Sequence, residues 1–286
     1  MHSDIALPKI EHPIAVRSRF SVAGPAGFRL RVQLVWLALL TLLLGLFYNL
    51  GLDFGLIGQK LPFMLGLRLS PDGFVQGVAL TLLITMISMV VSLVVAVLTA
   101  LGRLSSNALS FGLTTFYASF FRGTPLLVQV LIIYLALPQF GIVLSGFASG
   151  ILALSLNYGA YLAETIRAGI LSVPRGQAEA AKALGLGRGV IAFKIIAPQA
   201  MRIIIPPAGS NFISMLKDSS LVSVMGLWEL NFLAQSYGRS TYHYMEMLLT
   251  AAAIYWLLSI GLELIQNRLE RRFGRGFAAD RQGGLS

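Results

Sequence analysis

The sequence predicts an all-α membrane protein with about six transmembrane helices, and three observations carry this prediction. Of 286 residues, 56% are hydrophobic and only 12% are charged, against about 25% charged residues in an average soluble domain. The mean hydropathy is +0.76. Long charge-free runs also recur along the chain. Because a water-facing surface needs charge to stay dispersed, the composition excludes a soluble globular domain.

The helices follow from apolar segments, since about 20 apolar residues cross the hydrocarbon core. Six segments have this length: 32–52, 73–102, about 111–136, about 146–168, about 201–222 and about 246–266. The third and fourth divide one charge-free run, and Pro138 with Gly141 marks the turn between them. Pro125 cannot donate a backbone hydrogen bond, so a kink or break is expected in the third helix. Pro206 and Pro207 are expected to bend the fifth.

The distribution of basic residues predicts the orientation. With the N-terminus in the cytoplasm, the outside segments hold only four of the 22 Lys and Arg residues, namely Lys60, Arg68, Lys217 and Arg239. Cytoplasmic loops carry the excess of Lys and Arg, so both termini are predicted to be cytoplasmic. Residues 1–31 are then a mobile tail, and residues 271–286 a basic one. No small-x-small cleavage site follows 32–52, which is therefore predicted to remain as a membrane helix rather than a cleaved signal.

The net charge of +10 and the absence of cysteine limit the partners and the kinds of site that we expect. A basic surplus suits nucleic-acid binding, but in a membrane protein it more readily reflects loops that sit against anionic lipid. We therefore expect membrane lipid, and no nucleic acid, as a partner. The lack of cysteine excludes disulfides, thiolate metal sites and a cysteine nucleophile. His2, His12 and His243 are too scattered for a metal site.

The connection between 167 and 202 is long for a loop and contains its own helix signal. Strong helix formers fill 177–184, Pro174 precedes them, and Gly185 with Gly187 ends them. This pattern predicts a short amphipathic helix along the cytoplasmic face. Glu179 stands among alanines and no Trp or Phe offers a lipid anchor, which favours a protein-docking surface over a helix that rests on lipid head groups.

The same segment carries a family resemblance. Glu179-Ala180-Ala181, followed by Gly185, Ile195 and Pro198, resembles the EAA loop of bacterial ATP-binding cassette importer permeases. Ala197 departs from the leucine that this family usually has before the proline. Five further segments resemble the polar amino acid subfamily (the histidine, glutamine, arginine and opine group): 122–129, 157–164, 173–177, 198–200 and 216–221. The resemblance covers about 70–270, a five-helix permease core, and leaves 32–52 as an extra transmembrane helix.

The resemblance implies a multi-pass subunit of the bacterial cytoplasmic (inner) membrane that imports a polar amino acid by alternating access. It implies pairing with a second permease subunit, identical or related, and delivery of the amino acid by an extracytoplasmic solute-binding protein. A cytoplasmic ATPase is expected to dock on the coupling loop 168–200, through Gln177, Glu179, Ala180, Ala181, Ala183, Leu184 and Gly185. The chain contains no phosphate-binding G-x-x-x-x-G-K-[ST] loop, so ATP and Mg are assigned to the partner ATPase, with no cofactor and no catalytic residue here.

Polar residues inside the membrane are costly, so they are candidates for the substrate pathway. The candidates are Asn157, Tyr158, Glu164, Lys217, Asp218, Ser219 and Ser220. Asn157 has an alternative role as an interhelical hydrogen bond. Glu164 can pair with Arg167 on the next turn, as a structural ion pair or as part of a gate.

The adjacent pair Lys217 and Asp218 offers opposite charges to an amino acid zwitterion. Neighbouring helix residues point about 100° apart, however, so an internal ion pair with other helices is the alternative. Arg122 is expected to anchor its helix by reaching toward the membrane surface.

Two other functions remain open on the sequence. An ion- or proton-coupled secondary transporter or channel would usually show inverted repeats and carboxylates in the middle of its helices, and neither is clear here. A membrane scaffold that only recruits a cytoplasmic partner would not need polar residues inside the bundle.

Overall fold

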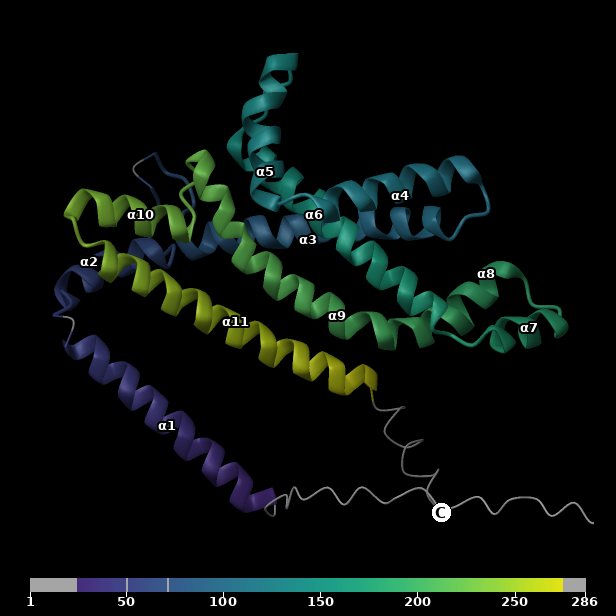
Figure 1. Cartoon of the computed structure of the whole chain (residues 1–286), viewed down its shortest axis with the longest axis horizontal. Helices are drawn as coiled ribbons and strands as arrows, with labels where there is room; N and C mark the ends of the chain where they lie inside the picture. Colours follow the sequence, from purple (N-terminus) through teal and green to yellow (C-terminus); the bar gives the residue numbers. More distant parts are fainter. Residues whose placement is uncertain (1–24, 50, 71, 275–286) are drawn as a thin grey trace, which may run out of the picture. The chain divides into compact units, whose positions relative to one another are not determined.

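The computed structural model describes residues 25–49, 51–70 and 72–274, and this part of the chain is built from helices and turns, with one isolated bridge and no strand (Figure 1). It divides into two units, Met1–Leu52 and Asp53–Ser286, which we describe separately. In the first unit, α1 covers Pro25–Asn49 and its apolar part is Leu30–Leu43.

The boundaries predicted for the first helix and for both tails need correction. α1 begins before residue 32, because a helix can continue past the arginines that end an apolar run. Residues 25–31 and 271–274 are helical rather than part of the tails. The rest of the predicted tails, 1–24 and 275–286, lies outside the described residues.

The second unit contains the remaining helices. They are α2 (Phe54–Met64), α3 (Gly77–Arg103), α4 (Ala108–Gly123), α5 (Leu126–Leu131), a π segment (Ile132–Ala136), a 3₁₀ segment (Leu137–Phe140), α6 (Gly146–Leu171), α7 (Arg175–Ala183), α8 (Arg188–Val190), a π segment (Ile191–Ile196), α9 (Ala197–Asp218), a 3₁₀ segment (Ser219–Met225), α10 (Leu230–Thr241) and α11 (Tyr244–Gly274).

Three stretches of the described chain are long and apolar enough to cross a membrane: Gly77–Arg103, Arg188–Met225 and Tyr244–Arg272. A fourth candidate is the pair Ala108–Gly123 and Leu126–Phe140, whose two parts meet at 107°. The segment predicted over 111–136 is therefore two helices with a sharp bend between them, and the break falls at the expected Pro125. Thr124 before this proline is extended (φ −117°, ψ 145°), which is the conformation that a following proline favours.

Two short helices, α2 and α10, were not predicted from the sequence. Their apolar patterns are short, and α10 owes its start to a buried cap. The Glu229 side chain accepts hydrogen bonds from the backbone N–H groups of Asn231 (2.9 Å) and Phe232 (2.7 Å). It also accepts one from the Tyr255 hydroxyl (2.8 Å), which connects α10 to α11.

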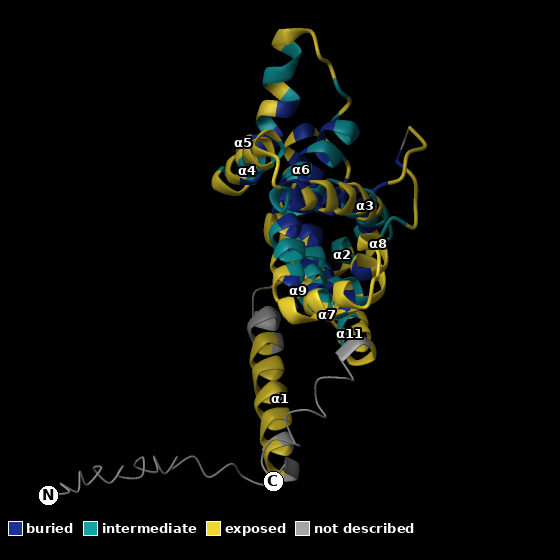
Figure 2. Ribbon diagram, turned by 90° about the vertical axis from the view of Figure 1, so that its right-hand side faces the viewer, coloured by how far each residue is buried: buried dark blue, intermediate teal, exposed yellow. Residues whose placement is uncertain are grey.

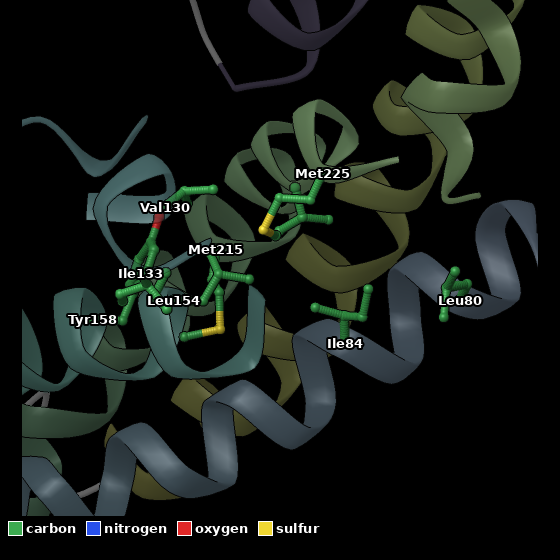
Figure 3. Packing of buried hydrophobic residues seen from close by; sticks show 10 residues of the cluster. Leu80, Ile84, Val130, Ile133, Leu154, Tyr158, Met215 and Met225 are labelled. Atoms are coloured by element: carbon green, nitrogen blue, oxygen red, sulfur yellow. The ribbon is translucent and has the colours of Figure 1, made fainter. Parts of the chain in front are cut away.

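A buried core joins α3, α5, α6 and α9 (Figure 3). Ile84, Leu154 and Met215 are fully buried in it and come from three of these helices. The outward faces of the helices are largely exposed (Figure 2), and large apolar residues such as Leu98 and Phe116 are among the exposed ones. An exposed apolar surface on this scale is expected of helices that face lipid tails rather than water.

The helix α7 occurs where the sequence places one, and it ends as expected. Gly185 follows with φ +76°, a left-handed conformation that glycine adopts without steric cost. In the second unit, α7 and α8 lie at the opposite end from α2 and α10 (Figure 1). The long helices α3, α9 and α11, which contain candidate membrane spans, run between the two ends (Figure 1).

The start of α3 gives a test of the packing. Gly77 has φ +60°, and a Cβ there would lie 2.2 Å from the Met64 backbone oxygen. We expect Gly77→Ala to lower the melting temperature of the purified protein by about 5 °C or more, since both strain and overlap arise. Gly73→Ala is the matched control: φ is +80° but a Cβ has open space, so strain alone should cost about 2–4 °C. Equal shifts would contradict the close contact between α3 and the end of α2.

Candidate polar cavity between α4, α6 and α9

A cavity of about 530 Å³ opens beside the break between α4 and α5. Polar side chains from α6 and α9 line it together with the residues of the break. The lining residues are Arg122, Gly123, Thr124, Pro125, Leu126, Asn157, Tyr158, Tyr161, Asn211, Ser214 and Asp218. Three of the predicted pathway residues therefore share one cavity, and Arg122, Asn211 and Ser214 are lining residues that the sequence analysis did not single out for the pathway.

Asp218 and Tyr158 connect α9 to α6 at this cavity. The Tyr158 hydroxyl donates a hydrogen bond of 2.7 Å to Oδ2 of Asp218. Oδ1 of Asp218 receives no hydrogen bond from the described residues, so it can accept one from a ligand in the cavity.

Lys217 faces elsewhere, because adjacent helix residues diverge. It lines a separate cavity of about 410 Å³ that Glu263 and Gln266 also line. Within residues 25–49, 51–70 and 72–274, every ion pair involves Glu164, so neither Lys217 nor Asp218 forms the internal ion pair that was the alternative. The two residues also do not face one ligand together.

Asn157 combines both of the roles considered for it. Its Nδ2 donates to the Phe121 backbone oxygen (3.0 Å) and to Oε1 of Gln129 (3.1 Å), while the residue also lines the cavity. Gln129 is buried, and its Nε2 donates to Oγ1 of Thr124 (2.8 Å). These bonds hold the broken backbone between α4 and α5. Sequence reasoning missed Gln129, although an amide four residues after a helix-breaking proline is a usable signal.

Ser219 and Ser220 do not line the cavity. Ser219 is fully buried and its hydroxyl donates to the Leu216 backbone oxygen (2.7 Å). The Ser220 backbone oxygen accepts a hydrogen bond from Nδ2 of Asn231 (3.4 Å). Both residues begin the 3₁₀ segment after α9, which places them in the structure of the turn.

Glu164 on α6 is surrounded by three guanidinium groups. The predicted pair with Arg167 is present, at 2.5 Å between Nη2 and Oε1. Arg103 from the end of α3 forms a second ion pair, with Oε2. Arg122 from the end of α4 is more distant, at 3.5 Å from Oε2, and its guanidinium lies 5.5 Å from the centre of the Tyr161 ring. Arg122 is thus part of a charged cluster instead of a simple surface anchor.

A third cavity, of about 540 Å³, is lined by both Glu164 and Arg122. Arg122, Tyr161 and Asn211 line this cavity and the first one as well. Asp218 lines only the first of these two cavities and Glu164 only the other, so the shared residues connect the two.

The residues predicted to couple to an ATPase lie on α7 and the turn after it. Gln177, Glu179, Ala180, Ala183, Leu184 and Gly185 are exposed. Ala181 is buried, at 3% exposure, so it faces its own chain and packs α7 against the segment that leads into α9. The exposed set covers the outer surface of the helix.

Apolar helices around a polar cavity are typical of integral membrane proteins that move solutes. The sequence pattern of the family described as "Binding-protein-dependent transport system inner membrane component" matches residues 92–275, and the chain belongs to this family. It is therefore a multi-pass subunit of a binding-protein-dependent transport system in the inner membrane.

Two curated relatives and one solved structure are similar over most of their length. The L-cystine transport system permease protein TcyB of Bacillus subtilis (strain 168) is 42% identical over 200 residues, 70% of this chain and 86% of that one. The arginine transport system permease protein ArtQ of the same organism is 36% identical over 224 residues, which are 78% of this chain and 98% of ArtQ. A crystal structure of an amino acid ABC transporter with histidines superposes with a TM-score of 0.70 at 36% identity. The superposition covers 77% of this chain and 99% of that one.

Proposed function

We propose that the chain is the membrane-spanning subunit of an ATP-driven importer for a polar amino acid. The observation that carries this proposal is the polar cavity, which holds one carboxylate, Asp218, and one guanidinium, Arg122, inside an apolar bundle of this family. An α-amino acid presents an ammonium and a carboxylate, which are complementary to these two groups. Curated relatives named for cystine and arginine transport support the substrate class.

The proposed membrane arrangement has six spans with both termini in the cytoplasm. The spans are α1, α3, the bent pair α4 and α5, α6, the run from α8 through α9, and α11. Residues 70–270 then form the permease domain, and α1 is an additional helix. The excess of Lys and Arg on the side of α7 supports this orientation.

The proposed partners follow from the exposed surface of α7. A cytoplasmic ATPase receives this helix in a cleft, with Glu179 in the contact, and supplies the bound ATP and Mg. A short rigid helix transmits rigid-body motion, whereas a flexible loop would absorb it. A second permease subunit completes the transmembrane pathway, and an extracytoplasmic solute-binding protein delivers the amino acid.

Uptake by reconstituted vesicles tests the proposal. The permease is incorporated with its ATPase and binding protein, and L-arginine, L-histidine, L-glutamine and L-cystine are offered in turn. We expect accumulation of at least one of them that requires ATP on the ATPase side and stops without the ATPase. Accumulation driven by a proton or sodium gradient in vesicles without the ATPase would overturn the proposal in favour of a secondary transporter.

A further inference from the structure

The strongest unexplained feature is the imbalance of charge around Glu164. Three guanidinium groups from three helices meet one carboxylate, so the cluster carries two surplus positive charges. Arg103 and Arg167 make the closer ion pairs and are 17% and 30% exposed. Arg122 makes the longest, at 3.5 Å, and is 41% exposed. Arg122 is the member of the cluster that can leave without depriving Glu164 of a partner.

Arg122 also faces the place where a second carboxylate would arrive. It and Asp218 are the charged residues that line the cavity of about 530 Å³, and Arg122 lines the neighbouring cavity beside Glu164 as well. An ammonium group that binds the free Oδ1 of Asp218 brings a carboxylate into the same cavity as this guanidinium. A bidentate guanidinium–carboxylate pair is stronger and more directional than a single contact at 3.5 Å.

We propose that Arg122 exchanges partners when substrate enters: it pairs with Glu164 in the empty protein and with the α-carboxylate of the amino acid in the loaded one. The inference rests on the proposed function and assigns carboxylate recognition to this residue. Arg103 and Arg167 keep Glu164 neutralised during the exchange. Glu164 connects the ends of α3 and α4 to α6. When Arg122 leaves Glu164, α4 loses this contact with α6, so binding of substrate in the cavity changes how the two helices are held together.

The exchange can be tested by measuring amino acid binding to the purified complex of permease and ATPase, without the binding protein. The probes are L-arginine, L-histidine, L-glutamine and L-cystine, each compared with its α-carboxamide, which lacks the negative charge. Wild-type protein should bind the acid at least about tenfold more tightly than the carboxamide. Arg122→Gln should reduce this ratio to about one by weakening acid binding alone, and Arg122→Lys should give an intermediate ratio.

Glu164→Gln distinguishes the exchange from a purely structural role of Arg122. It removes the competing carboxylate, so affinity for the acid should rise by about threefold or more while affinity for the carboxamide stays constant. Arg202→Gln is the matched control, because Arg202 is an exposed arginine on α9 that lines neither cavity and forms no ion pair in the described chain. It should leave the ratio unchanged. Carboxamide binding by each variant reports that its cavity is folded.

Three results would count against the exchange. An unchanged acid-to-carboxamide ratio in Arg122→Gln would show that this residue does not recognise the carboxylate. Weaker acid binding in Glu164→Gln would show that the cluster supports the cavity instead of competing with it. Either result leaves the proposed function intact if wild-type vesicles still accumulate an amino acid. Failure of wild-type protein to bind or transport any of the four amino acids would overturn both proposals.

Discussion

Glu179→Lys is expected to reduce ATP-driven uptake by at least about tenfold while the permease folds normally. Glu179 is exposed on α7 and makes no hydrogen bond or ion pair within the described residues, so its replacement leaves the fold unstrained. In the proposed contact, α7 enters a cleft of the ATPase with Glu179 in the interface. A few residues of an interface carry most of its binding energy, so reversing the charge of Glu179 should weaken the contact strongly. The measurement combines uptake by reconstituted vesicles with co-purification of the ATPase.

Ser106→Lys is the control for added positive charge on the same side of the protein. Ser106 is exposed in the short connection between α3 and α4 and does not belong to α7, so uptake should stay near the wild-type rate. Uptake by Glu179→Lys that equals uptake by this control would show that α7 does not couple the two subunits.

Asp218→Asn is expected to lower uptake by about 10- to 100-fold. The substitution removes the negative charge proposed to meet the substrate ammonium, and a hydrogen bond to a charged group contributes about 1.5–3 kcal/mol. The asparagine side-chain oxygen still accepts the hydrogen bond from Tyr158, so the contact between α6 and α9 persists. Initial rates across a substrate series should show a raised KM.

Tyr158→Phe separates the charge from the hydrogen bond. It removes the donor to Asp218 but leaves the carboxylate, so its effect on KM should be several-fold smaller. An equal loss in the two variants would indicate that the contact between the helices, and not the charge, supports uptake.

Local sequence signals predicted several elements because their causes are local. Pro125 interrupts a helix wherever it stands, and the break between α4 and α5 occurs there. Alanine-rich residues before Gly185 form α7, since helix propensity and a left-handed end need no distant partner. The apolar runs likewise mark α3, α6 and α11, although helix ends extend beyond the charge-free part.

Other features depend on residues far apart in the chain, which no local pattern reveals. α10 begins at Glu229, whose buried carboxylate is held by Tyr255 from the next helix. The pairing of Glu164 with Arg167 follows from helix spacing, but its contacts with Arg103 and Arg122 require α3, α4 and α6 to converge. The separation of Lys217 from Asp218 into two cavities also depends on which helices surround α9.

By itself the sequence determined the membrane character, most of the long helices and the short helix α7, because hydrophobicity, proline geometry and helix propensity act over one or two turns. Only the tertiary structure decided which polar residues share a cavity and which guanidinium makes the longest contact with Glu164. A cavity arises where several helices meet, and the direction that each side chain takes there follows from how those helices pack.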